Sequence, residues 1–425
     1  MSPREHPLET HSLSAAKRRL LEKWLAGQLR ERPEAPLPII PPHAGVNGHR
    51  DATSIPVSNK MLLQVTPYRP EHFDALQRFV ARVGLRLSLA HAPFVNYYYA
   101  EQDWCRLYLA IGPDERIVAT YGLEIARFEY NHNPMTMGLS SNFYSIQAGA
   151  GLFLFGCASQ WCPVRLIFGG TTDTQKMFRD LKWKYYEGMR IYVLNRSFDA
   201  YPGDSWVRVA GKSLAQRLAR RRLSHFASRL PFEVCGQVSV REQRSFSEDL
   251  LPVRSPFTFR FAPSLDYLTW RYNPALPFVR YRLFRILNNR QTAGYVVINE
   301  RPDKIIVAHC DGTDARILAF GVLRAIMQVG RADRLPRSVI LASCHRTMQE
   351  IYLRFGFRPE PEHRPFYIGT VDGSVQIDGD TSNWLVNFDW GDNGLRAPFL
   401  DQHETVDTAH PSKLYSPSSP ATQHV

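Results

Sequence analysis

The same order of secondary-structure patterns occurs twice along this chain of 425 residues, and this repetition limits the fold more than any other feature. Each copy reads as a hairpin, a strand, a turn, a helix, a strand, a helix and a closing strand. The copies share this order without sharing their sequence. Residues 59–200 contain the first copy and residues 231–371 the second. We therefore expect an α/β (mixed α+β) fold of two tandem units, each a central mixed sheet flanked by helices.

Three further segments lie outside the two units. Residues 1–58 combine an expected amphipathic helix at 12–28 with a Pro-rich linker. Such a helix is too short to bury its apolar stripe alone, so it needs either the body of the protein or a partner. Residues 201–230 read as a basic connecting helix, and residues 372–425 form an acidic tail. The tail contains Trp384, Phe388 and Trp390, which we expect to lie on the second unit.

The charge balance is basic, with 52 Lys and Arg against 40 Asp and Glu and a net charge of +12. Seven basic residues lie in 201–230, against Asp204 alone. Such a patch attracts polyanions. No helix-turn-helix, zinc finger or aromatic-basic RNA motif accompanies it, so we do not expect a nucleic-acid partner. An acidic protein and the phosphates of a nucleotide cofactor account for the charge equally well.

Several protein classes are excluded by simple patterns. The first residues lack the apolar core of a secretory signal. The longest apolar stretch, 148–164, is interrupted by Ser159 and Gln160 and is too short to span a bilayer. Six cysteines are few, and the pair Cys157 and Cys162 has no second pair at zinc-site spacing. We expect a cytoplasmic protein without a metal site or a membrane partner.

A glycine-rich turn is the most informative local pattern. A predicted strand at 135–144 is followed by the turn Gln147-Ala148-Gly149-Ala150-Gly151 and a helical run at 152–160. Consecutive backbone N–H groups at a helix N-terminus suit an anion such as pyrophosphate, and glycine allows a ligand to approach closely. A tightly packed helix start explains the glycines equally well. Corresponding helices in the second copy are expected at 315–329 and 348–355.

The whole order of elements resembles the GNAT superfamily of acyl-CoA-dependent N-acyltransferases, here as two copies in tandem. The opening Tyr68-Arg69-Pro70 and the hairpin Asp114 to Gly122 are similar to the first three strands of that family. The phosphate loop fits 146–151 or 148–153, although neither register begins with the usual Arg or Gln. The closing signature Tyr-x-x-x-Gly-Phe occurs at Tyr352 to Phe357 in the second unit.

The resemblance implies a division of labour between the two units. The second unit has Asp314 to Leu318 where its phosphate loop would stand, and side chains there would crowd a pyrophosphate. We therefore expect the first unit to bind the donor, acyl-CoA or acyl-phosphopantetheine, and the second to shape the acceptor pocket. The residues expected at the donor are Ser141, Phe143, Gln147, Gly149, Ala150, Gly151 and Leu152.

The resemblance also implies the chemistry. In the family an amine attacks a thioester, a base takes its proton, a backbone N–H stabilises the oxyanion and an acid protonates the thiolate. Glu124 is the candidate base, with backbone around Asn142 as the oxyanion donor. His309 and Tyr352 are further candidates for proton transfer. A surface carboxylate, a structural histidine and a packed tyrosine are the alternatives.

The function that follows is transfer of an acyl group from CoA or a phosphopantetheinyl carrier protein to a small-molecule amine. Residues 12–28 resemble the linker helices of nonribosomal peptide and polyketide synthetases, so we expect a role in that biosynthesis. A carrier protein or synthetase module would dock through this helix and through 201–230. Two alternatives stay open, a catalytically degenerate scaffold and a thioester decarboxylase for chain loading.

Overall fold

The computed structural model describes residues 53–390, except for 57–61, 85–87, 102, 159–160, 163, 169–171, 188, 195–204, 208–209, 212–213, 215–236, 302–303, 332–337, 361–365 and 371–376. The expected helix at 12–28, its Pro-rich linker, most of the basic connecting helix at 201–230 and the end of the acidic tail lie outside the described residues. Within the described residues, no helix is both long and apolar enough to cross a bilayer.

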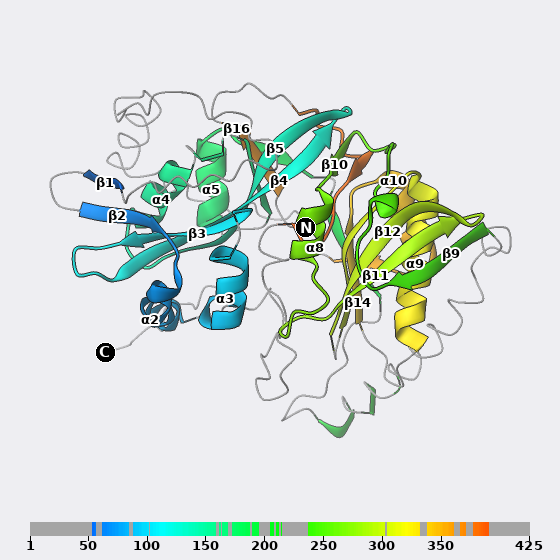
Figure 1. Ribbon diagram of the computed structural model, residues 1–425, viewed down its shortest axis with the longest axis horizontal. Coiled ribbons are helices and arrows are strands. Elements are labelled where there is room, and N and C mark those ends of the chain that lie inside the picture. Colours follow the sequence, from blue (N-terminus) through cyan, green and yellow to red (C-terminus); the bar gives the residue numbers. More distant parts are fainter. Residues whose placement is uncertain are drawn as a thin grey trace, which may run out of the picture. The chain divides into compact units, whose positions relative to one another are not determined.

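The first unit follows the predicted order closely (Figure 1). Its elements are β1 (Thr53–Pro56), β2 (Leu62–Pro67), η1 (Pro70–His72), α2 (Phe73–Val83), η2 (Ser88–Ala90), α3 (Ala92–Tyr99), β3 (Cys105–Ile111), β4 (Ile117–Tyr130), β5 (Asn133–Ser145), α4 (Ala150–Ala158), β6 (Val164–Phe168), α5 (Thr172–Asp180), β7 (Lys184–Tyr186) and β8 (Arg190–Leu194). The helix expected at 152–160 begins two residues earlier, at Ala150.

The second unit repeats the pattern. Its elements are β9 (Val238–Gln243), η3 (Glu248–Leu250), β10 (Phe259–Phe261), α8 (Leu265–Arg271), β11 (Tyr281–Asn288), β12 (Gln291–Glu300), β13 (Lys304–Gly312), α9 (Ala315–Arg331), β14 (Ser338–Ser343), α10 (Arg346–Arg354), β15 (Arg358–Pro359), β16 (Phe366–Thr370) and β17 (Trp384–Leu385). The helices expected at 315–329 and 348–355 are α9 and α10. The predicted mixed α/β class is confirmed.

Each sheet opens between its two central parallel strands. In the first sheet β5 pairs with β6 only at Gly138↔Arg165 and Leu139↔Leu166, although β5 continues to Ser145. In the second sheet β13 pairs with β14 only as far as Ile306↔Ile340, although β13 continues to Gly312. Both sheets therefore carry a gap at the carboxyl ends of a parallel pair.

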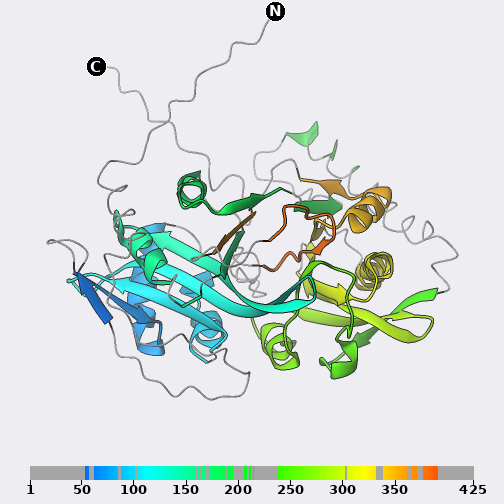
Figure 2. The same cartoon turned by 90° about the horizontal axis from the view of Figure 1, so that it is seen from above.

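Four strands lie in the sheet of the other unit, among them β10 and β17 of the second copy, which join the first sheet through β4. The first sheet has the order β1-β2-β3-β4-β5-β6-β16-β7, so β16 of the second copy stands between β6 and β7. The second has the order β15-β8-β14-β13-β12-β11-β9, so β8 of the first copy stands between β14 and β15. Figure 2 shows the orange-brown β16 beside green strands of the first copy. The boundary expected near residue 200 therefore divides the sequence into two copies, but each sheet contains strands from both sides of it.

The helices cover the sheet faces unequally. Alternate residues of β3 divide between two cores, with Leu107 and Leu109 facing α2 and α3, and Tyr108 and Ala110 facing α4 and α5. In the second sheet α9 and α10 cover one face (Figure 1). The other face of that sheet packs into the core that also holds α2, α3 and α8. Side chains of both units therefore meet around α3 and α8.

Candidate functional site

A β-bulge lies at the mouth of the first gap. Gly122 pairs with Ser141 and Thr120 pairs with Tyr144, so β5 carries one residue more than β4 across this interval. Asn142 in the bulge has a φ of 46°, the left-handed region that costs a residue with a side chain about 1–3 kcal/mol. The predicted oxyanion segment, Ser141 to Phe143, is therefore a strained stretch beside the gap.

Neighbouring side chains hold the bulge in place. Thr120 Oγ1 donates to the Asn142 carbonyl at 2.9 Å, and Asn142 Nδ2 donates to Tyr99 Oη at 2.6 Å. Gly122 is required because a Cβ there would lie 2.4 Å from Ser141 Oγ and 3.1 Å from Tyr99 Oη. These contacts preorganise the backbone that would face a thioester carbonyl.

The glycine turn leads from this bulge into α4. Gly149 has a φ of 84°, and a Cβ added there would meet nothing within 4 Å, so the space in front of the turn is open. Gly151 is buried, and a Cβ there would lie 3.0 Å from Ser145 Cβ. Gln147 precedes the turn, Ala150 is the first helical residue and Leu152 is half-buried in the first turn of α4.

The electrostatics of this turn suit an anion. The first turn of α4 contains no acidic residue, so its N–H groups and helix dipole are not neutralised by a carboxylate. Open space at Gly149 gives room for a phosphate to reach them. The residues present therefore fit the pyrophosphate of an acyl-CoA or, more simply, a phosphopantetheine phosphate.

The corresponding helix start in the second unit carries a carboxylate. Asp314 precedes α9, and its Oδ1 accepts the N–H of Ile317 at 2.8 Å. This cap satisfies an N–H group that a phosphate would otherwise use, and its negative charge repels an anion. The expectation that side chains fill this position agrees with the structure.

The second gap is filled by the chain itself. Hydrogen bonds attach residues 382–389 along the ends of β13 and β14, four of them at successive positions of this segment. These join Arg346 N–H to the Ser382 carbonyl at 2.9 Å, Cys344 Sγ to the Trp384 carbonyl at 3.1 Å, Cys310 N–H to Asn387 Oδ1 at 2.9 Å, and Asp389 N–H to the Ala308 carbonyl at 3.1 Å. Trp384 and Trp390 are buried. They were expected to lie on the second unit, but they also contact Tyr186 and Phe128 of the first unit. A pantetheine arm therefore has no comparable space in the second unit.

Glu124 lies on β4 in a buried ion pair between the units. Its Oε1 accepts from Arg271 Nε at 2.9 Å and from Tyr267 Oη, both on α8. Gly122 and Glu124 are two residues apart on one strand and face the same side, so this carboxylate is next to the bulge. Burial opposes the charge of Arg271, but Glu124 and nearby tyrosines hold the pKa of the guanidinium well above its usual value.

His309 belongs to the same neighbourhood. It is fully buried on β13, its Nε2 is 2.9 Å from Tyr295 Oη, and its ring stacks on Tyr272 at 5.5 Å. Burial, and then the positive charges of Arg271 and Arg260, lower the pKa of His309 to about 3. The imidazole is therefore neutral near pH 7 and can accept or donate a hydrogen bond there.

Tyr352 lies elsewhere. It packs on α10 in the core beneath α9, near Tyr192 and Phe357, and burial raises its pKa well above the usual value. The structure thus brings together Glu124, Asn142 and His309 and leaves Tyr352 on the opposite face of the second sheet. This position does not favour Tyr352 as the acid for a donor in the first unit.

Sequence reasoning missed Tyr99, Arg271 and Asp389. The stretch Leu268 to Tyr272 carried a signal, since a buried Arg among aromatics needs a carboxylate partner. Asp389 lies between Phe388 and Trp390, in a tail from which only the aromatic residues were selected as notable. Within the described residues, no group of three or more His, Cys, Asp or Glu is arranged to hold a metal ion.

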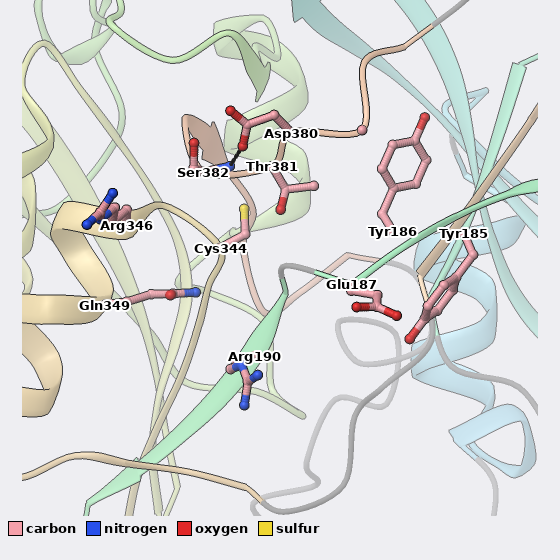
Figure 3. A pocket seen from close by; sticks show the side chains of 11 residues that line it. Tyr185, Tyr186, Glu187, Arg190, Cys344, Arg346, Gln349, Asp380, Thr381 and Ser382 are labelled. Atoms are coloured by element: carbon pink, nitrogen blue, oxygen red, sulfur yellow. Dashed lines mark hydrogen bonds between the residues drawn. The ribbon is translucent and has the colours of Figure 1, made fainter.

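A polar pocket lies where the chain passes from one sheet to the other. Its volume is ≈ 580 Å³, and it is lined by Tyr185, Tyr186, Glu187, Arg190, Cys344, Arg346, Gln349, Gly379, Asp380, Thr381 and Ser382. Figure 3 shows Cys344, Thr381, Glu187 and Arg190 around the open space. Its lining contains both acidic and basic side chains, and both units contribute to it.

Comparison with known proteins gives distant likenesses. No protein-family model matches the sequence, and no curated protein sequence matches it. Among solved structures, a tandem GNAT protein from the clavulanic acid biosynthesis pathway is similar at 12% identity, over 74% of this chain and 100% of that one, with a TM-score of 0.44. Saccharomyces cerevisiae N-myristoyltransferase with bound myristoyl-CoA is similar at 9% identity, over 79% and 91%, with a TM-score of 0.47. A probable N-acyltransferase from Enterococcus faecalis V583 is similar at 10% identity, over 73% of each chain, with a TM-score of 0.44.

Proposed function

We propose that the chain is an N-acyltransferase whose first unit binds the acyl donor, acyl-CoA or acyl-phosphopantetheine. The observation that carries this proposal is the difference between the two gaps. The first has an open glycine turn, a helix start without an acidic residue in its first turn, and a preorganised bulge. The second has a capped helix and is filled by residues 382–389. One donor per chain is therefore expected.

The residues of the first unit divide the chemistry among them. Backbone N–H groups of Gly151 and Leu152 in the first turn of α4 would bind the donor phosphate, and the backbone of Ser141 to Phe143 would receive the developing negative charge on the thioester oxygen. Glu124 would take the proton of the attacking amine, because it is the carboxylate nearest the bulge on the same face of β4. A donor bound in the gap supplies the thioester that the amine attacks.

Isothermal titration calorimetry of the full chain with CoA and acetyl-CoA tests the proposal. We expect a stoichiometry of one per chain. A stoichiometry of two would show that residues 382–389 yield to a ligand. Absence of binding to either compound would favour the degenerate scaffold over the enzyme. Release of the free carboxyl group of malonyl-CoA as CO₂, with acetyl-CoA as the product and no amine present, would favour the decarboxylase.

A carrier protein is the partner that we propose for the donor. In the described part of the connecting segment, Trp206, Val207 and Leu214 are exposed by 81%, 60% and 59%. The sequence of 201–230 also contains seven basic residues. Apolar and basic side chains in one segment suit an acidic protein partner. Deleting residues 1–45 should leave the melting temperature nearly unchanged and lower turnover only with a carrier-bound donor. An equal loss with acyl-CoA would argue against docking through 12–28.

A further inference from the structure

Four buried polar atoms at the interface between the units have no hydrogen-bond partner among the described residues. They are Glu124 Oε2, Arg271 Nη2, His309 Nδ1 and Asp389 Oδ2. Their residues are exposed by only 1%, 1%, 0% and 4%. Leaving a buried polar atom unpaired costs about 1–3 kcal/mol, and charged groups cost more. Arg271 is bonded to Glu124, the His309 ring stacks on Tyr272 next to Arg271, and Asp389 N–H donates to the carbonyl of Ala308 next to His309. The four residues therefore share one neighbourhood, where an occupant would satisfy the unpaired atoms. We call these four residues the interface cluster.

The interface cluster gathers around Arg271. Glu124 Oε1 accepts from Arg271 Nε at 2.9 Å. The charges of Arg271 and Glu124 both act on the Asp389 carboxyl, and the charge of Arg271 also acts on His309. The four residues come from β4, α8, β13 and the segment that fills the second gap. The acceptor side of the site is therefore formed by both units.

The interface cluster also lies next to the bulge. Tyr98 and Tyr99 are adjacent on α3, with Tyr98 Oη 3.5 Å from Arg271 Nη1 and Tyr99 Oη 2.6 Å from Asn142 Nδ2. Glu124 faces the same side of β4 as Gly122, which pairs with Ser141. A nitrogen bound at Glu124 Oε2 would thus be close to a carbonyl carbon held at the bulge.

The unpaired atoms define the chemistry of the occupant. Two carboxylate oxygens accept hydrogen bonds, and a neutral imidazole nitrogen can do so as well. A primary ammonium group offers three donors and no acceptor, which matches these atoms. Arg271 Nη2 can only donate, so it needs an oxygen on the same molecule. An ammonium group with a neighbouring oxygen acceptor satisfies the whole cluster.

We propose that the interface cluster binds the acyl acceptor, and that this acceptor is a small primary amine with an oxygen acceptor beside its amino group, the chemistry of an α-amino acid. This proposal rests on the proposed N-acyltransferase function. Glu124 Oε2 takes one proton from the ammonium group. The nitrogen lone pair then attacks the thioester carbon, the C–S bond breaks with its electron pair on sulfur, and the leaving thiolate takes the second nitrogen proton. Amide and free thiol are the products.

The first experiment measures product formation by the full chain. Acetyl-CoA is incubated with each of the common α-amino acids and with alkylamines of matched length, and N-acetylated products are detected by mass spectrometry. We expect at least one amino acid to be acetylated, with kcat/KM at least tenfold above that of its matched alkylamine. Equal rates with the alkylamine, or no acylated amine from a chain that binds acetyl-CoA, would overturn the proposal.

The second experiment uses Asp389→Asn, which keeps the shape of the side chain and removes its charge. We expect the KM for the amino acid to rise at least tenfold, with acetyl-CoA affinity unchanged in calorimetry. Saturation-transfer NMR of the amino acid on the CoA-loaded chain should lose its signal in the variant. Glu124→Gln serves as a second variant and should give the same loss of signal. Asp180→Asn is the matched control, because Asp180 is exposed at the end of α5, and it should change neither the KM for the amino acid nor the NMR signal.

The outcomes separate the two proposals. If the chain fails to bind acetyl-CoA, the proposed function fails. If acetyl-CoA binds and amines are acetylated, but Asp389→Asn keeps the KM and the NMR signal of the parent, only the acceptor assignment fails. The unpaired atoms would then be satisfied by water.

Discussion

Asn387 pairs with Cys310 through both ends of its side-chain amide. Its Oδ1 accepts the Cys310 N–H at 2.9 Å, and its Nδ2 donates to the Cys310 carbonyl at 3.2 Å. The amide thus takes the place of a backbone peptide on a neighbouring strand. It satisfies both polar groups of Cys310 where β14 has diverged from β13. A ligand that needed these groups would have to displace Asn387 first.

Asn387→Ala should destabilise the fold without affecting donor binding. It leaves the N–H and carbonyl of Cys310 buried and unpaired, so we expect the free energy of unfolding to fall by about 2–4 kcal/mol. Urea denaturation measures the loss, and calorimetry with acetyl-CoA measures donor affinity. Asn133→Ala, at the exposed first residue of β5, is the control and should cost far less. A marked loss of donor affinity in Asn387→Ala would place the donor in the second unit.

Gly149→Ala should weaken CoA binding at least tenfold. A methyl group there projects into the open space that we assign to the donor phosphate. The positive φ of 84° adds a backbone cost of about 1 kcal/mol to the fold. Gly84→Ala carries the same backbone cost, because Gly84 has a φ of 72° and open space as well, but it lies at the end of α2. Both variants should lose similar stability. Equal CoA affinities in calorimetry would remove the glycine turn from the site.

Glu124→Gln should lower turnover by about a hundredfold or more, as expected for loss of a general base. It also leaves Arg271 without its charged partner, so stability should fall by about 3–5 kcal/mol. Retained acetyl-CoA affinity then shows that the variant is folded. Tyr352→Phe should leave turnover close to that of the parent, because Tyr352 lies in the core beneath α9. If Tyr352→Phe lowered turnover more than Glu124→Gln did, the chemistry would be assigned to the second unit.

The stability of the fold should depend on pH through Asp389. Burial raises the pKa of Asp389 to about 6; the charge of Arg271 opposes this rise and that of Glu124 adds to it. The native chain therefore holds a proton between about pH 4 and 6 that the unfolded chain has released. The contribution of this proton to the free energy of unfolding is fully present below pH 4 and is lost as the pH rises through 6. The side chain in Asp389→Asn does not titrate. The free energy of unfolding of this variant, relative to that of the parent, should therefore rise by up to about 3 kcal/mol between pH 4 and 7. Urea denaturation of both proteins at pH 4 and pH 7 tests this. If the difference between their free energies of unfolding were the same at both pH values, the prediction would be contradicted.

The positions of the helices and strands could be predicted from the sequence better than the pairing of the strands within the sheets. Apolar periodicity and turn residues act locally, which is why the helices and the hairpins were found within a few residues of their places. The strand exchange could not be predicted, because β8 and β16 are short apolar strands that suit the centre of either sheet. Which sheet receives them depends on contacts far away in the sequence.

The candidate site divides in the same way. The glycine turn was recognisable because backbone conformation at Gly149 is a local requirement. The interface cluster was not, because Glu124, Arg271, His309 and Asp389 are brought together only by the packing of both units. Glu124 was proposed as a carboxylate near the thioester, and its pairing with Arg271 follows from the position of α8, which no local pattern reports.

The exchange of β8 and β16 makes each half of the chain incomplete by itself. A cut between residues 214 and 237 would leave β8 on the amino-terminal fragment and β16 on the carboxyl-terminal one, each embedded in the sheet of the other. The fragments would then behave as a non-covalent heterodimer that neither dissociates readily nor folds from one part alone. Sequence change in one half is likewise constrained by the other. A substitution near β6 must still allow β16 to pair there, and a substitution near β14 must still allow β8 to pair there.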